Sequence, residues 1–387
     1  GTYSAEGRIG WRRRQYRGAF RAIGREDAES LALRWTARAA PFRRAVETTA
    51  TYEALTERAP VLQETYVLVG PELGTHVWRD GEGEPRAGEP DGIAQVDEFF
   101  PETTPLEGTY ARTYVPGDDL FPAVGVQAHL RVRFDPSRLV GEASTGGVAR
   151  LARSVALTTT VDVRERTRED NLLRVLLLDP GVLQRPGAAG DSTGTLAGRF
   201  RLQQEVTLLP SNPRAGGRVS FAALSTTNRL AAGLERRRLR QVDAEGRFVP
   251  ASGLTLRLRS GWGHDRSDSD AFLTRTFDLT TLTVHPEATW APATGVSLTA
   301  GVAYADRSNA GALAGQPTGA RMWRAPIEAR VARAGRLAVG ARAEWANVDV
   351  LGGAGGGLLS YELTEGRGPG TSYLWGANLD YTLTRYL

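Results

Sequence analysis

One acidic stretch carries the spacing of a calcium-binding loop. Asp91, Gly92, the carbonyl of Ile93, Gln95 and Glu98 fall where the later ligands and the turn glycine of an EF-type loop would stand. Calcium takes six to eight oxygens, but the first ligand position falls on an alanine, which has no side-chain oxygen. The sequence therefore predicts a degenerate calcium loop or, alternatively, an acidic turn that no longer binds tightly. Its candidate metal residues are Asp91, Ile93, Gln95, Asp97 and Glu98.

Other reactive residues do not gather into a recognisable catalytic motif. Cysteine is absent, which removes thiolate ligands, disulfides and cysteine nucleophiles. The four histidines, at positions 76, 129, 264 and 285, have no metal-ligand spacing, and His129 and His285 fall on polar positions of predicted strands. No nucleotide or nucleophile-elbow motif stands in its required strand–turn–helix context. The sequence predicts neither an enzyme nor a bound organic cofactor.

Apolar and polar residues alternate with a period of two along most of the chain. Elements with this period must therefore position the residues considered above. Leu254, Leu256 and Leu258 share one parity while Thr255 and Arg257 share the other. A strand points successive side chains to opposite faces, so each such segment has one apolar and one polar face. Phe277 and Leu279 shift parity relative to Leu282, Val284 and Trp290, which suggests a β-bulge between them.

Strand length and aromatic placement favour a barrel over a sandwich. The alternating segments run about nine to twelve residues, against about five or six in ordinary globular strands and close to the length that crosses a bilayer. Several aromatic residues lie near the ends of apolar rows, where an interfacial girdle would place them. The predicted girdle comprises Trp290, Tyr304, Trp323, Trp345, Tyr373 and Trp375. The fold expected is all-β: an antiparallel up-and-down transmembrane β-barrel of roughly 12–16 long strands.

The polar parities predict a charged lumen. All 48 basic residues are arginines, set against 44 acidic residues, so the charge is mixed and argues against a nucleic-acid-binding domain. Arginines on polar strand positions would face the lumen and favour anions. The predicted lumen-facing residues are Arg131, Arg133, Arg199, Arg201, Arg257, Arg330 and Arg342.

Composition divides the chain into three parts. Residues 1–69 and 120–387 alternate and are predicted to be barrel strands, whereas residues 70–119 are rich in glycine, proline and acidic residues and are predicted to form one long loop. The only methionine is Met322, so the chain is expected to be truncated at its N-terminus. Outer-membrane lipid and the N-terminal remainder of a larger surface protein are the expected partners.

Three segments together resemble a known group of proteins. The segments Tyr66–Trp78, Asp91–Pro101 and Tyr361–Trp375 resemble the C-terminal, barrel-like region of large outer-membrane or cell-surface proteins of the Bacteroidota and Rhodothermota. That group is poorly characterised. The resemblance implies a barrel-like region at the end of a longer protein and implies no enzyme activity. The chain departs from the group's pattern at Ala87 and within Gly81–Glu89, in the first half of the calcium-like loop.

These observations leave two classes of function. The first is a Gram-negative outer-membrane barrel that acts as the membrane anchor, pore or translocation channel of a larger surface protein. The second is a soluble, extracellular β-rich module that binds polysaccharide or mediates surface adhesion. An enzyme is the weakest of the possibilities.

Overall fold

The computed structural model describes most of the chain. The residues outside the description are 1, 16–27, 71–73, 75, 83–89, 91, 93, 102–106, 141–145, 169–171, 180, 182, 185–193, 231–232, 271–274, 313–315, 334–336, 354–356 and 382–387. Asp91 and Ile93 of the predicted calcium loop fall among them.

The described chain is built almost entirely from strands, as the alternation predicts. Their bounds are β1 Thr2–Arg14, β2 Ala28–Ala40, β3 Val46–Leu68, β4 His76–Trp78, β5 Phe99–Pro101, β6 Tyr110–Phe134, β7 Val155–Arg168, β8 Gly194–Leu208, β9 Ala215–Leu230, β10 Gly233–Ala251, β11 Leu254–Ser269, β12 Phe277–Ala293, β13 Val296–Gly301, β14 Ala303–Asn309, β15 Pro317–Arg333, β16 Leu337–Gly352 and β17 Gly370–Tyr381. The predicted all-β class is confirmed.

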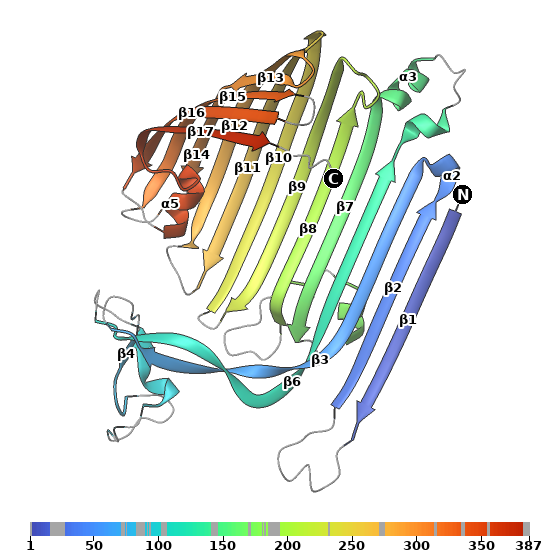
Figure 1. The fold of residues 1–387 in the computed structure, drawn as a ribbon. Helices are drawn as coiled ribbons and strands as arrows, with labels where there is room; N and C mark the ends of the chain where they lie inside the picture. The colour runs from blue at the N-terminus through green and yellow to red at the C-terminus, as the bar shows by residue number, and fades with distance from the viewer. Residues whose placement is uncertain are drawn as a thin grey trace, which may run out of the picture.

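These 17 strands belong to one antiparallel sheet. Each long strand pairs with the next long strand along the chain, from β1–β2 to β16–β17, in up-and-down order. Strands β4 and β5 are short, and β13 and β14 are consecutive halves of one strand that pairs with β12 and β15. Fourteen long strands remain, within the predicted range. They curve together into the barrel-like sheet of Figure 1.

The two ends of the meander are edge strands. Strand β1 is paired with β2 and strand β17 with β16, and no further strand pairs with either among the described residues. An even number of long antiparallel strands lies between β1 and β17, so these two strands run in opposite directions. They therefore have the relative direction that an antiparallel closure needs.

Strands β3 and β6 form a twisted ribbon that projects beyond the other strands (Figure 1). They stay paired from Val46–Phe134 to Leu68–Tyr110, with one irregularity between Pro60 and Leu62. The predicted loop of residues 70–119 is therefore too long at its C-terminal side, because β6 already begins at Tyr110. The glycine, proline and acidic residues of this segment are compatible with a twisted two-stranded ribbon that has a register shift. Composition alone does not distinguish such a ribbon from a loop.

Short helices lie in the connections. They are α2 Pro41–Arg44, η1 Val96–Glu98, η2 Pro136–Leu139, α3 Gly147–Ser154, α4 Leu172–Leu176 and α5 Gly357–Thr364. No helix in the described part of the chain is long and apolar enough to cross a membrane. Helix α4 packs on the apolar side of the sheet, where Val175 meets Val124 and Val126 and the Tyr52 hydroxyl donates to the carbonyl of Leu176 at 2.6 Å.

The connections differ at the two ends of the sheet. At the end where β1 begins, the turns are mostly tight, and Gly253 and Gly295 adopt positive φ of 79° and 84° in two-residue turns. At the other end lie the longer connections, including residues 69–109, 169–193 and 353–369. The only comparable connection at the tight end is residues 135–154, with η2 and α3.

Candidate functional site on the polar face of the sheet

The strand registers gather the polar parities on one face. In the strand register, Arg257 lies opposite Arg247 on one side and opposite Glu287 on the other. Arg201 lies opposite Asp162, which lies opposite His129. Residues directly opposite each other in an antiparallel pair point to the same side. All seven predicted lumen-facing residues lie on this face: Arg131, Arg133, Arg199, Arg201, Arg257, Arg330 and Arg342. We call it the polar face.

The polar face has one sector of neutralised arginines, on β9 to β12. Glu245 lies 3.1 Å from Arg218, 3.2 Å from Arg257 and 3.9 Å from Arg259. Arg257 also reaches Glu287 at 3.1 Å. These groups are only partly exposed, so solvent screens them less than it screens isolated surface pairs. The sector contributes rigidity and little net charge.

A second sector, on β6 to β8, carries arginines without ion-pair partners among the described residues. All five are exposed; they are Arg131, Arg133, Arg164, Arg199 and Arg201. The carboxylates on this part of the face are Asp162, which contacts His129 at 2.7 Å, and Glu205, which lies 3.8 Å from Arg218 of the neutralised sector. We call these five residues the arginine sector. It gives this part of the face a net positive charge.

Helix α5 is held against the polar face by arginines from several strands. Arg237 of β10 pairs with Glu362 at 3.0 Å, and Arg307 of β14 donates to the carbonyls of Glu362 and Leu363, both at 2.9 Å. Arg307 also pairs with Glu365 at 2.6 Å. Guanidinium donors at the last carbonyls of a helix satisfy groups that the helix itself leaves open.

Further contacts extend this attachment across the sheet. Arg324 of β15 reaches Glu365 at 3.3 Å, and Arg367 pairs with Glu344 of β16. Strands β10 and β16 are five steps apart, roughly 24 Å along the sheet at about 4.8 Å per step. One short segment that contacts both is expected on the inner side of a curved sheet. The polar face is therefore the inside of the curvature.

An apolar patch on the polar face receives the helix. Leu363 is 1% exposed and packs with Phe277, Leu279 and Ala320. The register of β11 with β12 runs without a shift from Leu254–Trp290 to Ser267–Phe277, so the predicted bulge near Phe277 is wrong. The parity changes because apolar residues at this end of β12 turn inward to meet α5, while those further along face outward.

The opposite face is apolar and bordered by aromatic residues. Tyr304 and Trp323 are register partners whose rings lie 4.6 Å apart, and Trp345 is opposite Tyr373. Trp290 lies six residues along β12 from Val284, the partner of Tyr304, a separation of roughly 20 Å at about 3.4 Å per residue. The six predicted girdle residues all lie on this outer face, and five of them, Trp290, Trp323, Trp345, Tyr373 and Trp375, expose more than a third of their surface. Trp375 lies two residues further along β17 than Tyr373, away from the border of the apolar face.

Additional aromatic residues join this face although the sequence analysis missed them as girdle members. Trp262 of β11 lies at the same end of its apolar row as Tyr304 and Trp323, and Trp35 of β2 is opposite Tyr52. The signal that would have found Trp262 is an aromatic residue that closes a run of alternating apolar positions, whereas Trp35 stands in the middle of its run. Trp262 and Trp35 are both more than 40% exposed.

The predicted calcium loop lies at the tip of the ribbon, and its glutamate has other partners. Glu98 Oε2 accepts from Trp78 Nε1 at 2.9 Å and from the backbone N–H of Gln95 at 3.1 Å, and Oε1 accepts from Gly81 N–H at 2.9 Å. Both oxygens therefore hold protein donors. One oxygen of Asp97 is buried without a partner among the described residues. Calcium binding remains a prediction, and Glu98 has a demonstrable structural role as the cap of the tip.

Hydrogen bonding lowers the pKa of Glu98. The largest cause is the indole N–H of Trp78, followed by the backbone N–H groups of Gly81 and Gln95. Donors that bind the carboxylate favour its charged form. The side chains of Tyr66, Phe99 and Tyr110 stack beside this site, with the first two rings 4.1 Å apart. The tip is therefore a small folded unit with an ionised carboxylate at its centre.

The histidines do not converge on a metal site. His129 and His285 lie on the polar face as predicted, whereas His264 contacts Asp278 at 2.6 Å on the opposite face and His76 packs on Tyr66. Groups of three or more potential metal-ligating side chains are absent from the described ranges.

Comparison with known proteins gives distant structural likenesses only. Neither a family model nor a curated protein matches the chain. Among solved structures, a bacterial polysaccharide outer membrane secretin has a TM-score of 0.32 at 9% identity, covering 91% of this chain and 89% of its own. Outer-membrane-expressed OmpT of Vibrio cholerae has a TM-score of 0.37 at 8% identity, covering 98% and 96%.

A third likeness is the open form of the ferric-catecholate import receptor Fiu of E. coli K12. Its TM-score is 0.40 at 10% identity, and the match covers 99% of this chain and 59% of the receptor. All three TM-scores are too low to bear on function.

Removing the apolar contact of α5 should release it from the polar face. Leu363→Ala is expected to destabilise the docked segment by about 2–5 kcal/mol, because it empties a buried site between α5 and the sheet. Limited proteolysis should then cut residues 353–369 faster than in the parent. Tyr361→Ala is the matched control, since Tyr361 lies on the same helix and is 61% exposed. Equal cleavage rates in parent and Leu363→Ala would contradict the docking role.

The ribbon tip should lose order in acid. The folded pKa of Glu98 is lowered, so its stabilising contribution is present above the ordinary carboxyl pKa and disappears as pH falls through the folded value. The indole N–H resonance of Trp78, followed by NMR, should therefore titrate at a pH below the usual glutamate range. Glu98→Gln should abolish this titration. A midpoint at or above the ordinary value would show that the hydrogen bonds do not stabilise the charged form.

Proposed function

We propose that the chain is an outer-membrane β-barrel whose polar face lines an anion-preferring pore. The observation that carries the proposal is the contrast between the two faces of one curved sheet. Arginine and carboxylate pairs occupy the inside of the curvature, whereas an apolar band with aromatic borders occupies the outside. A protein in water would favour the reverse arrangement, with the apolar face inward.

The apolar band has dimensions suited to a bilayer. On β11 it runs from Leu254 to Trp262, and on β15 from Trp323 to Val331. Each run spans eight residue steps, about 27 Å along the strand and roughly 20 Å in height at the usual tilt of transmembrane strands. Beyond the aromatic border of β11, the outer face turns polar, with Arg266 and Asp268. The strands are longer than the band because their ends continue into water.

The topology supports the same proposal. Fourteen long antiparallel strands are an even number, and the tight turns lie mainly at one end while the long connections lie at the other. Bacterial outer-membrane barrels combine these features, with short periplasmic turns and longer extracellular loops. On this reading the ribbon β3–β6 and its tip project outside the cell. Closure of β1 on β17 completes the barrel.

Within the pore, α5 acts as a constriction and the arginine sector sets the charge. Helix α5 lies on the inside of the curvature, attached to β10, β14 and β15, and so occupies lumen space. The positive charge of the arginine sector is not neutralised as it is around Glu245. A charged wall in a confined aqueous channel raises the local concentration of the opposite ion.

The resemblance to Bacteroidota and Rhodothermota surface proteins fits an anchor role alongside the pore. We propose that the barrel belongs to a longer surface protein whose remaining part it holds at the membrane. The alternative, a soluble β-rich binding module, predicts the opposite behaviour in buffer and is separated by the following experiment.

The folded chain should require detergent and migrate anomalously on gels. Removal of detergent is expected to precipitate it, because the outer face carries exposed residues such as Trp290, Ile327 and Leu258. Unboiled samples should run at a different apparent mass from boiled ones, since a closed sheet resists dodecyl sulfate. A monomer that stays soluble without detergent and shows no heat-dependent shift would support the soluble module instead.

Reversing two wall charges should shift ion selectivity. In planar bilayers under a salt gradient, the parent is expected to show an anion-selective reversal potential, and Arg199→Glu with Arg201→Glu should move it towards cation selectivity. The matched control is Arg238→Glu with Arg240→Glu, the same charge change on the opposite face of the sheet. The proposal fails if the parent shows no selectivity or if both double variants shift the potential equally.

A further inference from the structure

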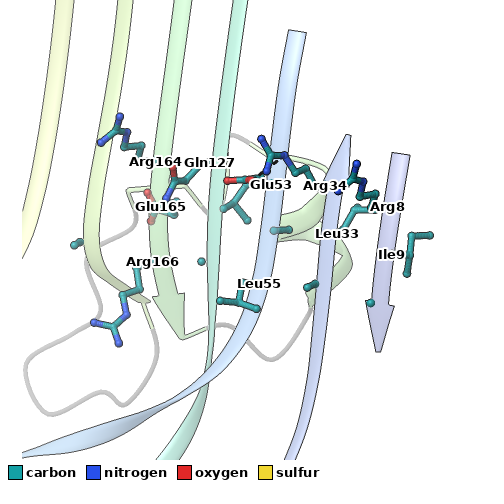
Figure 2. A pocket seen from close by; sticks show the side chains of 16 residues that line it. Arg8, Ile9, Leu33, Arg34, Glu53, Leu55, Gln127, Arg164, Glu165 and Arg166 are labelled. Carbon is teal, nitrogen blue, oxygen red and sulfur yellow. Dashed lines mark ion pairs between the residues drawn. The ribbon is translucent and has the colours of Figure 1, made fainter. Parts of the chain in front are cut away.

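The N-terminal strands form a hollow on the polar face, shown in Figure 2. Its volume is about 750 Å³. One row across the sheet, in register from β1 to β8, supplies the floor: Gly10, Ala32, Leu55, Gly125, Arg166 and Ala197. Four of these six residues are glycine or alanine. Short side chains leave the backbone open to close approach by a ligand.

The neighbouring row forms a charged rim. Arg8 pairs in register with Arg34, which pairs with Glu53, and further along Gln127 pairs with Arg164. Figure 2 shows the side chains of Arg34 and Glu53 meeting at the rim, and their ion pair measures 3.2 Å. With Arg166 from the floor, four arginines line the hollow.

Few carboxylates oppose these arginines. Glu53 is the acidic residue of the rim. Glu165 also contributes to the lining, but its register partner Val126 places its side chain on the opposite face. There it accepts hydrogen bonds from the Thr195 hydroxyl and the backbone N–H of Gln184. Among the lining residues whose side chains lie on the polar face, arginines therefore outnumber carboxylates four to one.

In and beside the hollow, two pairs of arginines face each other across neighbouring strands. Arg8 is directly opposite Arg34, and Arg164 is directly opposite Arg199. Like charges in this position destabilise a sheet unless something lies between them. Arg8 and Arg34 are each balanced, by Glu6 at 2.7 Å and by Glu53. Arg164 and Arg199 are both exposed and have no ion pair with any residue in the described part of the chain, so their guanidinium groups are open to an external anion.

We propose that the hollow binds a linear oligophosphate, with Arg164 of its lining and Arg199, which stands beside the hollow on β8, as its principal contacts. Guanidinium groups bind phosphate oxygens through two parallel hydrogen bonds, and two adjacent arginines would share one phosphate group. Arg34 lies three strand steps from Arg164, roughly 14 Å away across the sheet. A single phosphate does not reach both, whereas a chain of phosphates lying on the small-residue floor does.

The inference rests on the proposed function in one respect: it takes the polar face to be a pore wall that solutes reach. It adds the class of solute and the location of its site. The site is confined to one part of the polar face, because the neutralised sector around Glu245 lies on other strands and offers no comparable positive charge.

The test is calorimetric titration of the full chain, refolded in detergent, with inorganic tripolyphosphate and with orthophosphate at constant ionic strength. Tripolyphosphate is expected to bind at least about tenfold more tightly, since several charged hydrogen bonds are added. Arg164→Gln with Arg199→Gln should weaken tripolyphosphate binding at least about tenfold. The matched control, Arg238→Gln with Arg240→Gln, should leave the affinity within about twofold of the parent, because its charges lie on the outer face.

Folding of each variant is verified by heat-dependent gel migration. If the glutamine pair does not fold, Arg164→Lys with Arg199→Lys keeps the charge while removing the paired hydrogen bonds, and it should still lose most of the preference for tripolyphosphate. Equal weakening in the outer-face control, or no binding of tripolyphosphate by the folded parent, overturns the proposal.

The two proposals fail in different ways. If the parent binds tripolyphosphate but forms no conducting pore, the proposed binding site holds and the proposed pore fails. If the parent conducts anions selectively but does not bind tripolyphosphate, the proposed pore holds and the proposed binding site fails.

Discussion

The cross-strand register is the constraint on which both faces depend. From β1 to β17, the registers keep most polar positions of neighbouring strands on one face and most apolar positions on the other, with exceptions such as Glu165, which lies opposite Val126. A slip of one residue would move every side chain of a strand to the other face. It would place Arg257 among the leucines of the apolar band and Leu256 beside Glu287. The cost of burying unpaired charge in apolar surroundings makes such a slip unfavourable across the whole sheet.

The polar face is not uniform, and its differences follow from local pairing. Around Glu245 the carboxylates of Glu245 and Glu287 neutralise the arginines, which makes a stiff and nearly neutral wall. On β6 to β8, Arg199 and Arg201 keep their charge available to solvent. At the end of β12, Phe277 and Leu279 convert part of the same face into a seat for α5. One sheet face thus combines a rigid wall, a charged wall and an attachment site.

Alternation in the sequence was sufficient to predict the class of fold, the strand number range and the face on which residues such as Arg131 and Arg342 lie. These depend on a period of two, which each strand displays within itself. Helix α5 was not predicted, because its ion pairs join residues such as Arg237 and Glu362 that are 125 positions apart. The parity change at Phe277 was the one local trace of it, and a bulge explains such a change equally well from sequence alone.

The boundaries of the ribbon and the partners of Glu98 could not be predicted from the sequence for a related reason. A two-stranded ribbon with prolines and glycines has the composition of a loop, and only pairing between Leu68 and Tyr110 distinguishes the two. Glu98 has the position of a metal ligand in the motif, but Trp78, twenty residues before it, brings a competing donor. Such competition is decided by tertiary contacts, which spacing does not encode.

The unequal connections at the two ends of the sheet bear on how the chain would enter a bilayer. Residues 69–109 carry charged groups, among them Arg79 and Glu98, whereas turns such as 252–253 and 294–295 are compact. Moving a charged side chain through the centre of a bilayer costs about 2.5–3.5 kcal/mol even by the lowest scales. A chain delivered from the side of its tight turns must send the charged end across first, so the barrier to insertion is high. The same barrier then opposes reversal, and orientation in the membrane becomes a kinetic property that is settled once, at assembly.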